Sequence, residues 1–124
     1  MREFNYEDWV REKNNPSYLV YIITGETIWK NDFMLGIKNH LGIDYTMIHK
    51  DVGDIIKKLK YRPLDRKKHV ILFEPIGGIS NSDFNSIEEY IKNPSKHALF
   101  VISITNYGDK KKILNKFKYI EKSK

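Results

Sequence analysis

Short apolar segments alternate with longer segments of helical spacing along almost the whole chain, and this alternation limits the possible folds more than any other feature. Each apolar segment has the length of a strand, and each segment between two of them is long enough for a crossover helix. Crossovers of this kind join parallel strands and are right-handed. The pattern therefore predicts an α/β domain with a mainly parallel sheet and helices on both faces. The predicted strands cover residues 18–24, 45–49, 69–73 and 98–104.

The predicted helices have apolar residues three or four positions apart, with capping residues at their ends. Asn5 can cap a short first helix, Gly42 can end a long second helix, and Asp51 can cap a third. A fourth helix is expected to begin near Ser82 or Asp83 and to stop before the next proline. The residues expected on buried helix faces are Trp29, Phe33, Ile37 and Leu41, then Val52, Ile55, Ile56 and Leu59, then Phe84, Ile87 and Ile91, and in a last helix Ile113, Leu114, Phe117 and Ile120.

The composition suits one domain with a hydrophobic core, since 40% of the 124 residues are hydrophobic. The lack of cysteine excludes disulfides and cysteine-ligated metal sites. The four histidines show no ligand spacing, so neither a metal site nor a cofactor is expected. No apolar run approaches the ~18 residues that would cross a bilayer, and the N-terminus lacks the apolar region of a signal peptide. These features predict a cytoplasmic protein without membrane contact.

The basic residues are concentrated in the second half of the chain. Residues 1–62 contain 10 basic and 9 acidic residues, whereas residues 63–124 contain 12 basic and 7 acidic ones. Such a basic excess commonly forms a solvated face, and the alternative is contact with nucleic acid or an acidic protein surface. The candidates for that contact are Arg66, Lys67 and Lys68, and Lys110, Lys111 and Lys112.

The segment after the first strand has the position of a phosphate-binding loop but lacks the residues that hold phosphate. A P-loop reads G-x-x-x-x-G-K-[ST] between a strand and a helix, whereas residues 25–30 read GETIWK, one residue too short. If Lys30 matches the lysine of the motif, Trp29 replaces the second glycine and Asn31 replaces the residue that would reach Mg²⁺. Glu26 adds a negative charge where the anion would sit. Lys30 can still meet a phosphate as a point charge, but an exposed helical lysine is the simpler interpretation.

No residue is assigned a catalytic role. Glu74 ends the third predicted strand, where a nucleotide-hydrolysing enzyme carries its Walker B acid. However, it is a single carboxylate followed by Pro75, and the loop that would hold the nucleotide is degenerate. The chain also has no G-x-S-x-G motif and no thiol nucleophile. We therefore expect no intrinsic enzymatic activity.

The order and spacing of these features resemble the N-terminal domain of the delta subunit of the bacterial DNA polymerase III clamp loader. The resemblance covers nearly the whole chain and rests on order and spacing rather than on one specific motif. It implies a degenerate P-loop NTPase (AAA+-like) domain that acts in DNA replication without hydrolysing ATP. The matching features are a strand ending in Gly25-Glu26, a helix leading into Arg62-Pro63-Leu64, a helix with Glu88-Glu89-Tyr90-Ile91 and Asn93-Pro94, and a basic segment with Asp109, Lys110 and Lys111.

This resemblance implies binding to the ring-shaped sliding clamp through the turn at about residues 60–67, where the family inserts apolar side chains into a clamp pocket. Leu64 stands at the family's exposed leucine, but Asp65 replaces the aromatic residue that commonly follows it. An aspartate in such a pocket costs desolvation unless it meets a cation. Either Tyr61 or Pro63 completes the apolar wedge, or clamp binding is weak or altered. The alternative for Leu64 is packing of the helix end onto the core.

Members of that family continue into a lid domain and a collar domain, and no part of this sequence corresponds to them. The chain is therefore expected to be either an excised N-terminal domain or a small stand-alone protein. Only the first would also contact other clamp-loader subunits, with DNA as a possible partner within the complex. Two other functions remain open. One is a small nucleic-acid-binding domain that uses the basic second half, and the other is an atypical nucleotide-binding protein.

Overall fold

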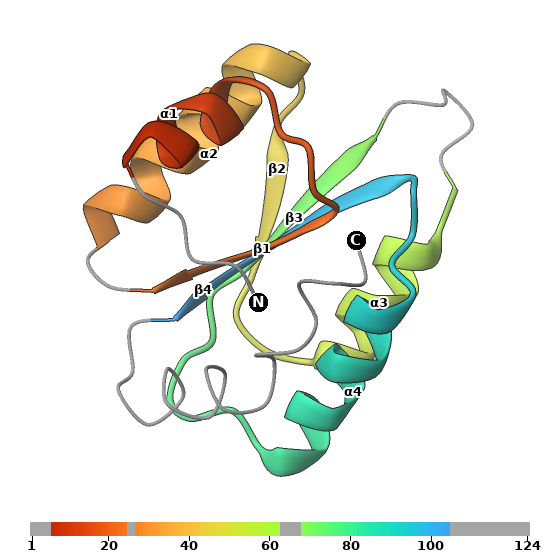
Figure 1. The fold of residues 1–124 in the computed structure, drawn as a ribbon. Coiled ribbons are helices and arrows are strands. Elements are labelled where there is room, and N and C mark those ends of the chain that lie inside the picture. The colour runs from red at the N-terminus through yellow and green to blue at the C-terminus, as the bar shows by residue number, and fades with distance from the viewer. Residues whose placement is uncertain (1–5, 25–26, 63–67, 105–124) are drawn as a thin grey trace.

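The computed structural model describes residues 6–24, 27–62 and 68–104, and it confirms the predicted alternation of helices and strands (Figure 1). None of the helices in these ranges is long and apolar enough to cross a bilayer. The proposed cap Asn5 and the predicted last helix lie outside the described residues. The elements are α1 (Tyr6–Asn14), β1 (Val20–Thr24), α2 (Thr27–Leu41), β2 (Tyr45–Ile48), α3 (Val52–Lys60), β3 (His69–Phe73), α4 (Asn81–Lys92) and β4 (Ala98–Ile104).

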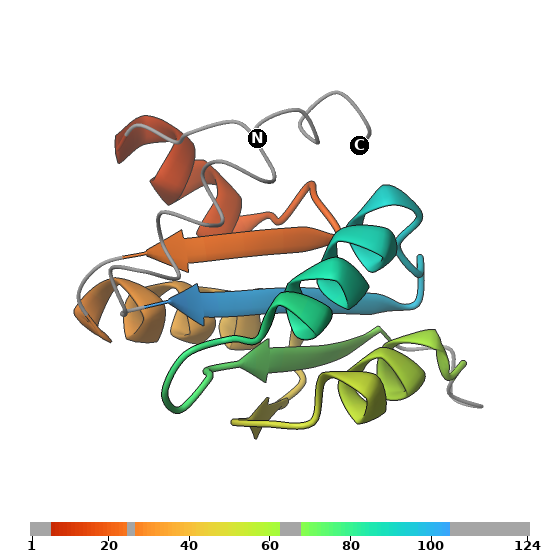
Figure 2. The same cartoon turned by 90° about the horizontal axis from the view of Figure 1, so that it is seen from below.

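The four strands form one parallel sheet in the order β1-β4-β3-β2. β4 lies between β1 and β3, with Phe100 opposite Val20 and Ile102 opposite Phe73. Every residue of β4 is buried, which agrees with its continuous apolar sequence. Figure 2 shows the strands side by side and running in the same direction, so all the loops that follow strands leave the sheet at one edge.

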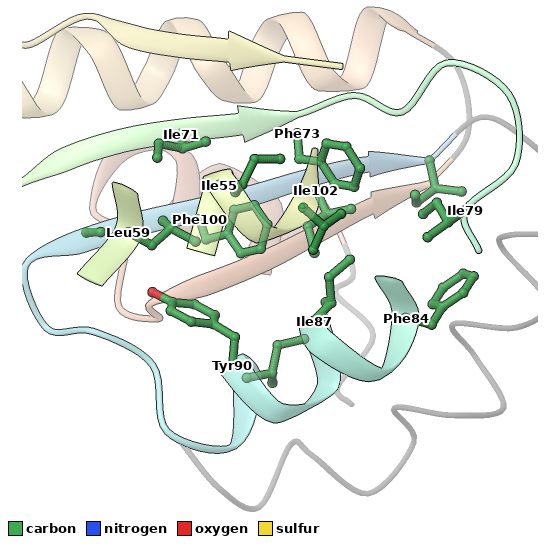
Figure 3. Close-up of a cluster of buried hydrophobic side chains, with 14 residues drawn as sticks. Ile55, Leu59, Ile71, Phe73, Ile79, Phe84, Ile87, Tyr90, Phe100 and Ile102 are labelled. Atoms are coloured by element: carbon green, nitrogen blue, oxygen red, sulfur yellow. The ribbon is translucent and has the colours of Figure 1, made fainter. Parts of the chain in front are cut away.

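Two helices cover each face of the sheet. α1 and α2 lie on one face, and α3 and α4 lie on the other (Figures 1 and 2). Alternate residues of β4 divide between the two layers, because successive side chains of a strand point to opposite faces. Phe100 and Ile102 join the α3 and α4 side chains shown in Figure 3. Leu99 and Val101 join the opposite cluster, which includes Phe33 of α2.

The helix ends follow local hydrogen-bonding chemistry at the predicted residues. Asp51 caps α3, because its side chain accepts a hydrogen bond from the Asp54 amide at 3.2 Å. Asp51 has a φ of 70°, a left-handed conformation that aspartate tolerates better than most residues. Gly42 ends α2 with a φ of 68°, and its amide binds the Lys38 carbonyl at 2.9 Å. Both predicted helix boundaries are confirmed.

Two details differ from the predictions. α4 begins slightly before Ser82, because the Ser80 hydroxyl accepts a hydrogen bond from the Asp83 amide at 3.1 Å and caps the helix. Trp29 was expected in the core, but it is 46% exposed. Its ring meets Trp9 of α1 edge-on, with the ring centroids 5.8 Å apart. Trp29 therefore lies at the margin of the α1 and α2 layer, where α1 covers only one side of the indole.

A buried carboxylate ties α1 to the start of β1. Glu12 is only 2% exposed, and it accepts hydrogen bonds from the Ser17 amide, the Ser17 hydroxyl and the Tyr21 hydroxyl at 3.1, 2.6 and 2.6 Å. Burial raises the pKa of Glu12, but the hydrogen bonds from Ser17 and Tyr21 outweigh it and leave this pKa below its ordinary value. Burial, together with the bond to Glu12, raises the pKa of Tyr21. The network fixes the angle at which the chain enters the sheet.

Candidate functional site

The two regions that the sequence singles out lie at opposite ends of the sheet. α2 follows β1, and Glu74 follows β3, so the start of α2 and Glu74 both belong to the carboxyl ends of the strands. This is the end at which parallel α/β sheets bind ligands. The turn between α3 and β3 precedes β3 and lies at the amino end.

Lys30 is not the exposed helical lysine that the sequence suggested. It lies near the start of α2 and is only 7% exposed. Its Nζ forms an ion pair and a hydrogen bond with Oε2 of Glu74 at 2.5 Å. The two residues are 44 positions apart in the chain, and β4 separates β1 from β3 in the sheet. The ion pair thus connects α2 to the end of β3.

The backbone around Glu74 is fixed by the end of β2. The Glu74 amide donates a hydrogen bond to the Ile48 carbonyl at 2.9 Å. Nδ1 of His49 lies 2.9 Å from the Glu74 carbonyl, so the ring donates to this oxygen through Nδ1–H. About a third of the Glu74 side chain is exposed, at 32%, whereas 9% of the Lys30 side chain is exposed. The carboxylate therefore has one face toward solvent and one toward a buried ammonium.

This arrangement limits the chemistry of the carboxyl end. The ammonium of Lys30 is already paired with the Glu74 carboxylate. Within the described ranges, no group of three or more histidine, aspartate or glutamate side chains is placed to hold a metal ion. Gly25 and Glu26 lie outside the described residues. The sequence analysis treated Lys30 and Glu74 separately and did not predict that they form an ion pair. The available signal was that Lys30 can be aligned with the P-loop lysine and Glu74 with the Walker B acid.

Only the two ends of the predicted partner-binding turn are described. Tyr61 forms the C-terminal cap of α3, and its amide binds the Lys58 carbonyl at 3.2 Å. The Tyr61 side chain is 64% exposed. Lys68, also exposed, directly precedes β3. The other predicted contact residues, which lie outside the described residues, are Pro63, Leu64, Asp65, Arg66, Lys67, Lys110, Lys111 and Lys112.

The structure adds further cations beside this turn. The last turn of α3 and the residues that flank the described gap carry exposed basic side chains, while the described acidic neighbour Asp54 pairs with Lys58 at 3.2 Å. Near this turn, the sequence analysis proposed only Arg66, Lys67 and Lys68 as contacts, and it treated the α3 lysines as a solvated outer face. We call this set the basic rim, and it consists of Lys57, Lys60, Arg62 and Lys68.

Comparison with known proteins does not place the chain in a family. No protein-family model matches the sequence, and no curated protein matches it at a significant level. The fold, the Lys30–Glu74 ion pair and the surface around Tyr61 are therefore the observations on which a functional inference can rest.

Proposed function

We propose that this chain is a non-catalytic sliding-clamp-binding domain of the type found in the delta subunit of the bacterial DNA polymerase III clamp loader. The observation that supports clamp binding most directly is the exposure of Tyr61 at the end of α3. An aromatic side chain that is 64% exposed at a helix end contributes little to the core and is available to a partner. It stands at the turn to which the resemblance assigns the clamp-binding wedge.

The parallel fold and the Lys30–Glu74 ion pair support the second part of the proposal, a degenerate P-loop NTPase domain. β1 leads into α2, which is the order of elements that a phosphate loop requires, and the proposal aligns Lys30 with the lysine of the motif. The ammonium is paired internally, so it does not supply the charge that holds the phosphates of a nucleotide. This domain acts by binding a partner, and ATP has no part in that binding.

Tyr61 can also replace the aromatic side chain that the wedge lacks because position 65 is an aspartate. The family's wedge has two large apolar side chains, and this sequence has only Leu64 at the matching pair. An aromatic ring buries about 150–250 Å² in an interface and commonly acts as an anchor. Tyr61 provides such a ring three residues before Leu64. We assign Tyr61 and Leu64 as the wedge and Pro63 as the residue that restricts the backbone between them.

The basic rim favours nucleic acid as a second candidate partner. Its four exposed cations lie at the end of α3 and just before β3, as does the exposed Tyr61 ring, and base stacking on an aromatic side chain beside basic residues is a common mode of single-strand binding. A domain that works in this way shows a steep loss of affinity with added salt. A clamp-binding domain anchored by Leu64 depends much less on salt, because its main contact is apolar.

The proposal predicts that Leu64→Ala weakens binding to a purified bacterial sliding clamp by about 1–3 kcal/mol, as expected for truncation of a buried apolar anchor. Asp65→Phe restores the family's apolar pair, so it should tighten binding. Affinity is measured by calorimetry on the whole chain, with thermal unfolding of each variant in parallel. Ile76→Ala is the matched control, because Ile76 is 78% exposed but lies at the opposite end of the sheet.

If Leu64 instead packs the helix end onto the core, Leu64→Ala lowers the free energy of unfolding by about 2–5 kcal/mol and leaves clamp affinity unchanged. That combination would refute the assignment of this turn. Single-stranded DNA is titrated in the same series. A salt-sensitive affinity for DNA that survives Leu64→Ala, without clamp binding, would favour the second candidate.

A further inference from the structure

The Lys30–Glu74 ion pair is partly buried, with 9% of the Lys30 side chain and 32% of the Glu74 side chain exposed. Lys38 and Asp44 also pair, at 2.8 Å, but their side chains are 52% and 80% exposed. A surface pair of that kind contributes little to stability. The Lys30 side chain is almost fully buried, so its ammonium needs an anionic partner in order to remain charged inside the fold.

Glu74 provides this anionic partner, and hydrogen bonds hold its backbone in place. Its amide and carbonyl are both bound by the end of β2, so the carboxylate approaches Lys30 from a fixed backbone. A phosphate ion would offer the same ammonium the same kind of contact, an anionic oxygen at hydrogen-bonding distance. The contact lies at the carboxyl end of a parallel sheet, where such ligands bind in this class of fold. The Glu74 carboxylate and a phosphate ion would therefore compete for the same position beside the Lys30 ammonium.

We propose that Lys30 and Glu74 form an anion-binding site that is filled from within, with the Glu74 carboxylate in the place that a tetrahedral oxyanion would otherwise take. The filled site links α2 to β3 without a ligand and excludes phosphate from the carboxyl end. Removal of the carboxylate opens the site to inorganic phosphate. This inference is independent of clamp binding, because it concerns the opposite end of the sheet.

The test is the thermal unfolding of the whole chain with increasing inorganic phosphate, against chloride at matched ionic strength. Glu74→Gln leaves Lys30 buried without an anion, so Tm should fall by on the order of 5–15 °C in chloride. Added phosphate should restore most of that loss in a saturable manner, because a ligand that binds only the folded state raises Tm. The unmodified protein should show no saturable response.

Two controls separate a specific site from a general salt effect. Lys30→Met combined with Glu74→Gln removes both charges, so phosphate should have no effect beyond that of chloride. Asp44→Asn breaks the exposed pair with Lys38 and should change neither Tm nor the response to phosphate. Where Glu74→Gln does not fold in chloride, recovery of cooperative unfolding in phosphate, and not in the double variant, is the same positive result.

The proposal is overturned if phosphate stabilises Glu74→Gln no more than it stabilises the double variant. It is also overturned if Glu74→Gln unfolds at the temperature of the unmodified protein, since the carboxylate would then not be the required partner of Lys30. A saturable phosphate response in the unmodified protein would show that the site is open rather than filled. None of these outcomes depends on a clamp, so they do not bear on the proposed clamp binding.

Discussion

At the scale of single residues, Glu12 shows how a charged group can be buried and still stabilise the fold. Three hydrogen-bond donors converge on its carboxylate, from Ser17 and Tyr21. They compensate for lost hydration, and the pKa of Glu12 lies below its ordinary value as a result. A lowered pKa in the folded state means that the stabilisation is present at neutral pH and is lost as the pH falls through that pKa.

We predict that Glu12→Gln lowers the free energy of unfolding by about 1–3 kcal/mol at neutral pH, because the amide nitrogen of glutamine cannot accept from these donors. The deficit should be smaller at about pH 3, which is below the ordinary glutamate pKa of about 4.3, because the stabilisation from the lowered pKa of Glu12 is lost as the pH falls. Urea unfolding at both pH values measures this difference. Glu7→Gln, an exposed position in the same helix, should show no such deficit, and an equal effect of the two changes would contradict the account.

At the scale of elements, the contact between α1 and α2 depends on one glycine. A Cβ at Gly36 would lie 2.6 Å from the backbone carbonyl oxygen of Lys13, closer than atoms can approach. Trp9 Nε1 and Lys13 Nζ both bind the carboxylate of Asp32, at 2.9 and 3.0 Å. These hydrogen bonds, first that of Trp9 and then that of Lys13, lower the pKa of Asp32. The close approach of α1 to α2 therefore requires a residue without a side chain at position 36.

Gly36→Ala should destabilise the protein by about 1–3 kcal/mol, because α1 must move away from α2 to make room for the methyl group. Gly53→Ala is the matched control in α3, where the nearest atom to an added Cβ is 3.9 Å away. There the better helix propensity of alanine should leave stability unchanged or raise it by up to about 1 kcal/mol. Chemical denaturation of both variants provides the test, and a stabilising Gly36→Ala would show that the close contact is absent.

At the scale of the whole molecule, the fold class could be predicted because local chemistry decides it. Apolar runs such as 69–73 and 98–104 became buried parallel strands, and Asp51 and Gly42 ended helices as their chemistry requires. Trp29 was placed wrongly, because helical spacing gives the face of a residue but not how far a neighbouring helix extends over it. The strand order was not predictable, since any order of parallel strands satisfies the same periodicity.

The candidate site was predicted only in part for a related reason. Lys30 and Glu74 each stood out by position, but their pairing depends on how α2 lies over the sheet. Helical and strand periodicity carry no information about this tertiary geometry. Tyr61 is exposed, and its part in partner binding stays a prediction. Leu64 and Asp65 lie outside the described residues, so their roles remain predictions.

The central claim is that this domain binds a sliding clamp without the help of a nucleotide. The most direct test is calorimetric titration of the whole chain with a purified bacterial sliding clamp, in the absence and in the presence of Mg-ATP. We predict saturable binding with the same Kd under both conditions, and no binding of Mg-ATP to the chain tighter than about 10 μM, or about −7 kcal/mol. The absence of clamp binding, or clamp binding that requires Mg-ATP, would contradict the account.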